Sequence, residues 1–124
     1  MTKRKTPDGA RQNGPALEKA YQFALWLVPT VEKFPRSQKF LLGDRLQSLA
    51  YDVIEGLVEA VYNRDREKIL KLVNLRLQKM RVMVRLASDL HHLDKRRYEF
   101  AARGIDEIGQ LVGGWLRADR AQKA

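Results

Sequence analysis

The stretch from Arg64 to Arg97 constrains the fold most, because its apolar side chains recur at the spacing of an α-helix. Successive members lie four and three residues apart and therefore share one helix face; they are Val73, Leu77, Met80, Val84, Ala87 and His91. Further apolar side chains widen this face: Leu72, Leu75, Val82, Leu86 and Leu90. The pattern predicts a long helix that Asp65 can cap and that ends near residues 91–93.

The same stretch is strongly basic. It holds eleven Lys/Arg against four Asp/Glu, and its midsection, from Lys68 to Arg85, contains no acid. A solvated helix face usually mixes both signs for pairing four residues apart, so this asymmetry favours an anionic partner over a plain solvated surface. The predicted nucleic-acid or partner-binding residues are Lys71, Arg76, Lys79, Arg81 and Arg85, with the basic cluster Lys95, Arg96 and Arg97 at the end of the stretch.

Three other helices are predicted around this one. The first opens at Pro15, which suits the first helical position, and ends before Pro35. The second spans about residues 37–63, and the fourth follows a capping Asp94. Because short links make neighbouring helices antiparallel, the expected fold is an all-α, up-down-up-down four-helix bundle. It would span residues 15–119, between a flexible basic arm (1–14) and a polar tail (120–124).

The sequence also indicates self-association. Trp26 lies off the main apolar stripe of its helix, and Gly109 and Gly113 share one face of the fourth helix beside Trp115. Glycines at this spacing indicate a close approach of two helices, within the bundle or between subunits, and a tryptophan supplies a large contact. These four residues are the predicted oligomer contacts, although physical reasoning alone does not fix the number of subunits.

Neither a catalytic site nor a metal or cofactor site is expected. The chain has no cysteine, no glycine-rich phosphate loop and no evident Ser-His-acid signature. Asp52, Glu55 and Glu59 share a helix face without the histidines of a carboxylate metal site, so pairing with a basic helix or solvation is favoured. Adjacent histidines, His91 and His92, cannot face one metal from a regular helix.

One catalytic pattern has to be weighed. Arg85 and His91 have the spacing of the Arg-x₄₋₆-His pattern of helical HEPN ribonucleases, which makes RNA cleavage a minor alternative. Leu86 follows the arginine where that family usually has a polar residue, and His91 lies on the apolar seam rather than on the polar side. There is neither a secretory signal nor an apolar run of about 18 residues, so a cytoplasmic protein without a membrane partner is expected.

Two segments resemble a known family. Residues 34–47, FPRSQKFLLGDRLQ, followed by Glu59-Ala60, resemble the opening of the second helix in the family of four-helix bundles that includes two groups. These are the intervening-sequence proteins of large ribosomal RNA and the accessory variability determinant (Avd) proteins of diversity-generating retroelements. Residues 108–116, IGQLVGGWL, are similar to the Gly-x-Trp-aliphatic ending of Avd proteins. The resemblance covers residues 16–118.

The resemblance implies a homopentameric barrel of four-helix protomers with a basic surface. Avd proteins bind the reverse transcriptase of the retroelement and nucleic acid, and they support mutagenic copying of template RNA into cDNA. We therefore expect a non-enzymatic accessory factor that binds reverse transcriptase, RNA or DNA, and further copies of itself. A protein-only adaptor of the ribosomal intervening-sequence branch is the main alternative. The sequence indicates neither which nucleic acid is bound nor where the reverse transcriptase docks.

Overall fold

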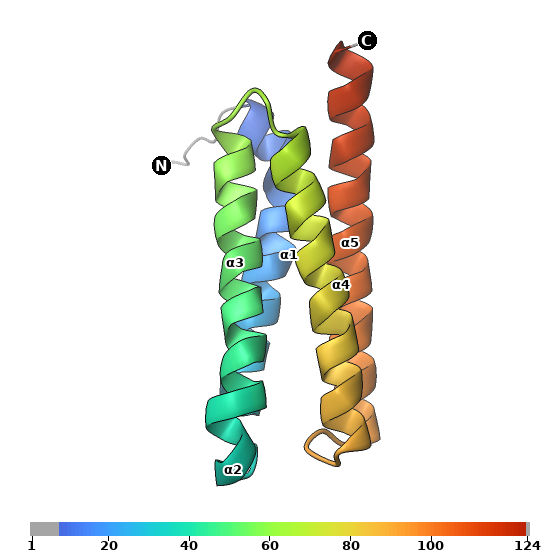
Figure 1. Cartoon of the computed structure of the whole chain (residues 1–124). Coiled ribbons are helices and arrows are strands. Elements are labelled where there is room, and N and C mark those ends of the chain that lie inside the picture. Colours follow the sequence, from blue (N-terminus) through green and yellow to red (C-terminus); the bar gives the residue numbers. More distant parts are fainter. Residues whose placement is uncertain (1–7, 124) are drawn as a thin grey trace, which may run out of the picture.

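The computed structural model describes the backbone of residues 8–123 and the side chains of residues 14–123 (Figure 1). Its helices are α1 (Asp8–Val31), α2 (Arg36–Gln38), the π-helix η1 (Lys39–Gly43), α3 (Asp44–Val61), α4 (Glu67–Asp89) and α5 (Lys95–Lys123). Because α2, η1 and α3 follow one another without a break, they act as one rod. The described residues therefore form four helical rods and no strand.

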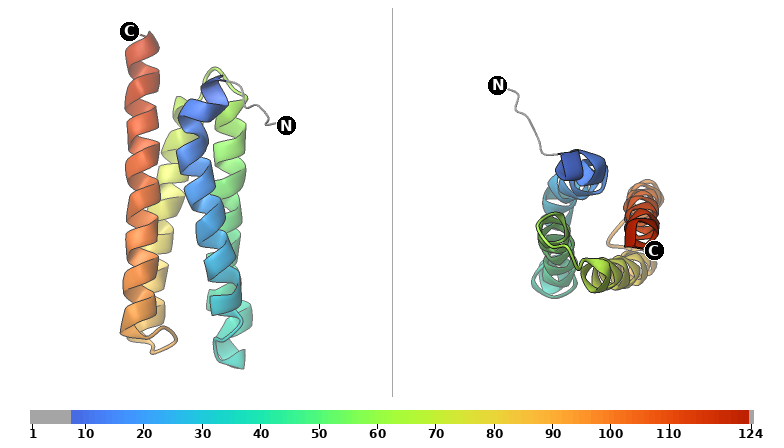
Figure 2. Two further views of the ribbon diagram at one scale, coloured as in Figure 1. Left: turned by 180° about the vertical axis from the view of Figure 1, so that it is seen from behind. Right: turned by 90° about the horizontal axis from the view of Figure 1, so that it is seen from above.

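The four rods alternate in direction around a common core. Helix α3 packs against α1 and α4, and α5 packs against α4 and α1 (Figures 1 and 2). This ring of neighbours confirms the predicted all-α, up-down-up-down bundle. Its topology has one consequence for function. The α1–α2 link and the α4–α5 link lie at one end of the bundle, while the α3–α4 link and the end of α5 lie at the other (Figure 1).

The predicted apolar seam of α4 faces the core. Val73, Leu77, Met80, Val84 and Ala87 are all buried, and they pack with residues such as Leu27, Leu57 and Ile108 from the other helices. The side chains predicted to widen that face do not reach the core. Exposed fractions between 43% and 65% place Leu72, Leu75, Val82, Leu86 and Leu90 on the outer surface.

The assignment of the two histidines is wrong, because α4 ends earlier than predicted. The His92 N–H donates to the carbonyl of Ala87 (2.8 Å) and the His91 N–H to that of Ser88 (2.9 Å), which is the hydrogen-bond pattern of a Schellman C-cap. His91 adopts a left-handed φ of 67° and is exposed. The turn instead places His92 against Phe34, with ring centroids 5.7 Å apart.

Both outer boundaries of the bundle also differ from the prediction. Helix α1 begins at Asp8 and continues through Pro15, so the expected arm is shorter; residues 1–7 lie outside the described part of the chain. Helix α5 continues to Lys123 rather than ending at residue 119. The Lys123 ammonium lies 3.3 Å from a carboxylate oxygen of Asp119 and donates to the carbonyl of Arg64 at 2.8 Å. These contacts hold the last turn that the sequence had assigned to a tail.

The close helix approaches occur at glycines other than the predicted pair. A Cβ at Gly56 would lie 2.6 Å from Cγ2 of Val73, and one at Gly104 would lie 2.9 Å from the ring of Phe23. These two glycines let α3 approach α4, and α5 approach α1. A Cβ at Gly109 would meet nothing within 4 Å. Gly109 therefore does not serve a close approach inside the bundle.

Candidate nucleic-acid interface

Two cations in the basic midsection of α4, Arg76 and Arg81, pair with acids from the neighbouring helices. The Arg81 Nε donates to Asp106 of α5 at 3.1 Å, and its Nη1 donates to the Tyr98 hydroxyl at 3.2 Å. The Asp106 hydrogen bond, followed by that of Tyr98, raises the pKa of Arg81 above its ordinary value. On the other flank, the Arg76 Nε lies 3.9 Å from a carboxylate oxygen of Asp52 in α3.

Other predicted cations pair within their own helix or cap. Lys71 lies 3.0 Å from Glu67, and Arg85 lies 3.9 Å from Asp89. Arg97 reaches the α5 cap residue Asp94 at 2.7 Å. Among residues 14–123, three of the predicted binding residues have no carboxylate oxygen within 4.0 Å of their side-chain nitrogens; they are Lys79, Lys95 and Arg96. The predicted ridge along α4 is therefore mostly a set of structural ion pairs.

A second group of exposed cations, at one end of the bundle, was not predicted as a group from the sequence. Lys33 and Arg36, from the link after α1, are exposed, as are Lys95 and Arg96 at the start of α5. The contact of Phe34 with His92 holds these two links side by side at one end of the bundle. We call Lys33, Arg36, Lys95 and Arg96 the basic end. None of the four has a carboxylate within 4.0 Å in the part of the chain that is described.

Two acids at this end, Glu32 and Asp94, already have cation partners. Glu32 pairs with Lys39 at 3.0 Å. Asp94 accepts a hydrogen bond from the Arg97 backbone N–H at 2.8 Å, as the sequence predicted for a cap. That bond, followed by the charge of Arg97, lowers the pKa of Asp94 below its ordinary value. Glu32 and Asp94 thus pair with Lys39 and Arg97, and the four cations of the basic end face solvent without an ion pair to a described residue.

Of the four predicted oligomer contacts, the two tryptophans pack against other residues of the same chain. Trp26 is half-buried between Phe23 and Phe100, with ring centroids 5.8 Å and 4.8 Å away. Trp115 is 7% exposed and packs in the core. Gly109 and Gly113 are partly exposed, with only Arg117 near a Cβ added at Gly113. The burial of Trp115 needs no second copy, and a contact through the other three residues stays a prediction.

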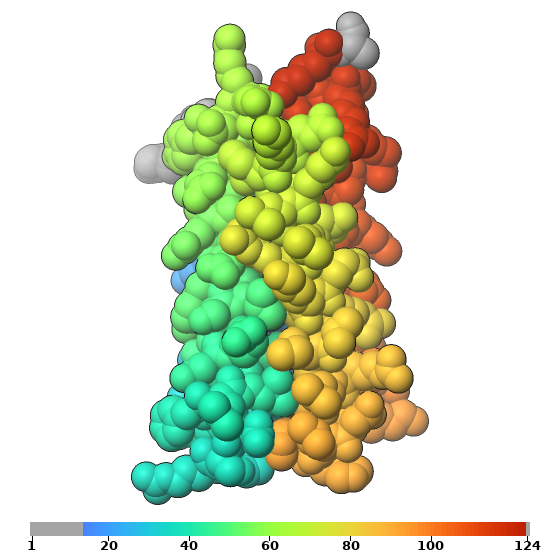
Figure 3. All heavy atoms as spheres, viewed as in Figure 1, coloured from blue at the N-terminus to red at the C-terminus, as the bar shows by residue number. Residues whose placement is uncertain are grey.

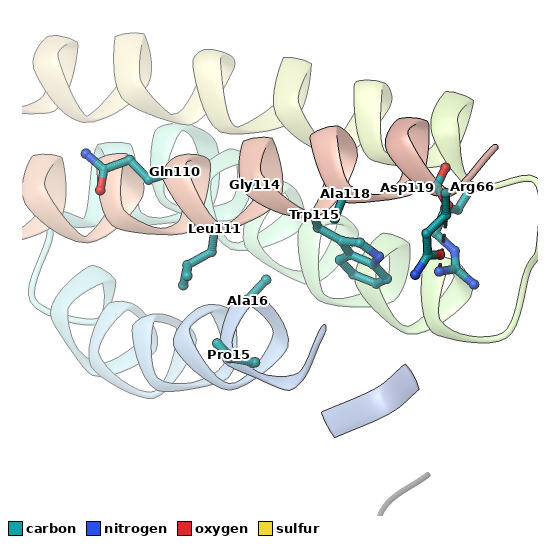
Figure 4. A pocket seen from close by; sticks show the side chains of 10 residues that line it. Pro15, Ala16, Arg66, Gln110, Leu111, Gly114, Trp115, Ala118 and Asp119 are labelled. Carbon is teal, nitrogen blue, oxygen red and sulfur yellow. Dashed lines mark ion pairs between the residues drawn. The ribbon is translucent and has the colours of Figure 1, made fainter. Parts of the chain in front are cut away.

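A cavity of about 490 Å³ opens at the end of the bundle opposite the basic end (Figure 4). Pro15, Arg66, Trp115 and Asp119 are among its lining residues. The buried Asp119 carboxylate has its two oxygens 3.9 Å from Arg66 and 3.3 Å from Lys123, and the Arg66 guanidinium lies over the Trp115 ring at 5.6 Å. Two cations thus compensate one buried carboxylate, and the arrangement ties the end of α5 to the α3–α4 link.

Two features weighed in the sequence, a metal cluster and the Arg85–His91 pair, are not assembled in residues 14–123. In the described residues no three His, Cys, Asp or Glu side chains are grouped to hold a metal ion. Arg85 is engaged by Asp89, and His91 lies beyond the last turn of α4, so the helix does not present the two on one face. Over residues 8–123, no helix combines the length and apolar composition needed to cross a membrane.

Comparison with known proteins places the chain in a family. Residues 16–118 match the family described as bAvd-like. This chain belongs to the bAvd-like family. The match covers the whole bundle apart from the beginning of α1 and the last turn of α5, and it confirms the resemblance to Avd proteins noted in the sequence. No curated protein sequence matches the chain.

The fold of this bAvd-like protein is shared with a solved structure. A protein of unknown function from the S23 ribosomal protein family of Bacteroides thetaiotaomicron superposes with a TM-score of 0.78. The alignment covers 86% of this chain and 98% of the other, at 15% sequence identity. The superposition shows that the two proteins share a four-helix fold. At an identity this low, it does not indicate a shared function or partner.

Proposed function

We propose that this protein is a non-enzymatic accessory factor of a diversity-generating retroelement. It acts in the cytoplasm as a homo-oligomer, a pentamer in the resemblance, and binds the reverse transcriptase together with RNA or cDNA. Membership of the bAvd-like family supports the accessory role and the protein partner. The contact with nucleic acid is carried by one observation, the four uncompensated cations of the basic end.

Phosphate is the group that the basic end suits best. Its cations come from two links that Phe34 and His92 hold together, so they form a patch rather than a line along one helix. Exposed lysines and arginines bind phosphate oxygens without reading base sequence. Phe34 is buried and His92 is partly buried, whereas Phe40, four residues after Arg36, is 60% exposed and offers one stacking surface; such stacking is tolerant of base sequence. We therefore propose salt-sensitive, sequence-tolerant binding of single-stranded RNA or cDNA.

The test is RNA binding by a charge-reversed basic end. K95E/R96E changes two solvent-facing cations without breaking an ion pair between described residues. Reversal of Arg81 would be a poor test, because it would set two acids against each other across the α4–α5 contact. We expect fluorescence anisotropy to show salt-dependent binding of labelled RNA by the wild type and weakened binding by the variant. Absence of wild-type binding at low salt would favour the protein-only adaptor.

A further inference from the structure

The outer face of α4 combines apolar side chains with unpaired lysines. Leu75, Val82 and Leu86 lie on the side of α4 away from the core, with exposed fractions of 49%, 65% and 43%. Lys68 and Lys79 share this face by helical spacing, and neither has a carboxylate within 4.0 Å among residues 14–123. Aliphatic side chains give phosphate nothing to bind, so this face fits a protein surface that is apolar and acidic.

The outer face of α3 has the opposite character. Tyr51, Val58 and Tyr62 are exposed at 45%, 40% and 82%, and the acids on the same side are Glu55 and Glu59. Neither acid has a Lys or Arg nitrogen within 4.0 Å in the described chain. Helices α3 and α4 are neighbours and lie side by side on one side of the molecule (Figure 3). One is apolar with free positive charge, and its neighbour is apolar with free negative charge.

We infer that the α4 outer face of one copy binds the α3 outer face of the next copy. This inference rests on the self-association included in the proposed function, and it names the surfaces that make it. Two α4 faces would bring lysines together and two α3 faces would bring acids together, so charge disfavours both symmetric contacts. A contact between unlike faces is heterologous, and each copy can then bind two neighbours.

The positions of the two faces favour a closed ring over a filament. Helices α3 and α4 occupy adjacent corners of the bundle, so their outward directions differ by roughly a quarter turn. A contact repeated with that turn returns to the first copy after a few steps, and the pentamer of the resemblance is one such ring. In a ring whose axis runs along the bundle, residues at equal heights on α3 and α4 of neighbouring copies meet.

The Arg76–Asp52 ion pair fixes those heights within one copy. Because α3 and α4 are antiparallel, moving one residue up one helix corresponds to moving one residue down the other. Tyr51 is therefore level with Leu77, and the exposed Leu75 lies two residues, about 3 Å, from that height along α4. By the same count, Glu59 lies close to the height of Lys68. Across the interface, we expect Tyr51 of one copy beside Leu75 of the next, and Glu59 beside Lys68.

The absence of native cysteine allows a direct cross-linking test. Single-cysteine Y51C and L75C proteins are purified, mixed, and treated with a short bis-maleimide without RNA. We expect a Y51C–L75C cross-link in the mixture and little product from either protein alone. A cross-link of L75C with itself would show a symmetric α4 contact and would overturn the inference, as would no cross-link in the mixture.

Charge reversal provides an independent arm. We expect K68E and E59K each to weaken self-association, measured as mass by light scattering, and K68E/E59K to restore it because every interface regains an opposite pair. Circular dichroism confirms that each variant is folded. Full assembly of both single variants would refute the assigned faces. RNA binding by the wild type is measured separately, so a failed interface and a failed nucleic-acid function give different results.

Discussion

Reversing the charge of the basic end should change both the strength and the salt dependence of RNA binding. In the wild type, Lys33, Arg36, Lys95 and Arg96 can each neutralise one phosphate. Each neutralised phosphate of a single strand contributes about −0.7 to the slope of log affinity against log salt, so the expected slope is about −2.8. Between about 50 and 200 mM salt, the affinity of the wild type should therefore fall about 50-fold.

The K95E/R96E variant keeps two of these contacts, so its slope should drop to about −1.4 and its affinity should fall only about sevenfold over the same range. At low salt it should also bind more weakly than the wild type, by about tenfold if each exposed contact contributes about 0.7 kcal/mol. The assay is fluorescence anisotropy with a short single-stranded RNA at several salt concentrations.

The matched control is R64E/R117E, which makes the same change in net charge at the opposite end of the bundle. Arg64 and Arg117 are exposed, and neither side chain forms an ion pair with a described residue. We expect this control to keep the wild-type slope. Equal loss in both variants would mean that net charge alone governs binding, and the assignment of the basic end would then be wrong.

Three further predictions concern the bundle itself. Gly56→Ala should destabilise the bundle by about 1–3 kcal/mol, because the new Cβ would lie 2.6 Å from Cγ2 of Val73. Gly109→Ala, where a Cβ meets nothing, should stabilise the bundle by about 0.5–1 kcal/mol. Urea unfolding measures the free energy of unfolding of both variants and should give changes of opposite sign. His91→Gly should stabilise the bundle by about 1 kcal/mol, because glycine adopts the left-handed conformation of this position without steric cost. His92→Gly should destabilise the bundle, because it removes the contact with Phe34. Shifts of the melting temperature in the same direction for both variants would contradict this. Because the pKa of Asp94 is lowered in the folded state, its contribution to stability is fully present above the ordinary value of 3.8 and is lost as the pH falls through the folded value. Asp94→Asn should therefore make the free energy of unfolding less dependent on pH in that range. An unchanged acid unfolding curve would show that Asp94 does not contribute to acid unfolding.

Much of the fold could be predicted from residue spacing, because burial in a helical bundle repeats along each helix. The 4-3 seam of α4 from Val73 to Ala87 and the cap at Asp94 are local patterns, and the structure confirms both. The end of α4 is harder to predict, because His91 adopts the left-handed conformation that a C-cap more often gives to glycine. The close approach at Gly56 depends on Val73 in another helix, which spacing within α3 does not reveal.

The candidate site was predicted less well, because charge compensation depends on contacts between helices. Arg81 appears unopposed along α4, yet its acid partner Asp106 lies 25 residues further on. The basic end could have been found from the predicted topology. An up-down-up-down bundle places its first and third links at the same end, so Lys33 and Arg36 had to lie near Lys95 and Arg96.

The position of the basic end at one end of every bundle gives the assembly a direction. In a ring with all bundles parallel, each copy contributes its basic end to the same rim, and the opposite rim carries the Asp119 ion pairs together with Arg64 and Arg117. Nucleic acid would then follow one circular edge and pass from copy to copy along a continuous positive track. The opposite edge would stay open to a protein partner, so reverse transcriptase and template could occupy the particle together without competing for one surface.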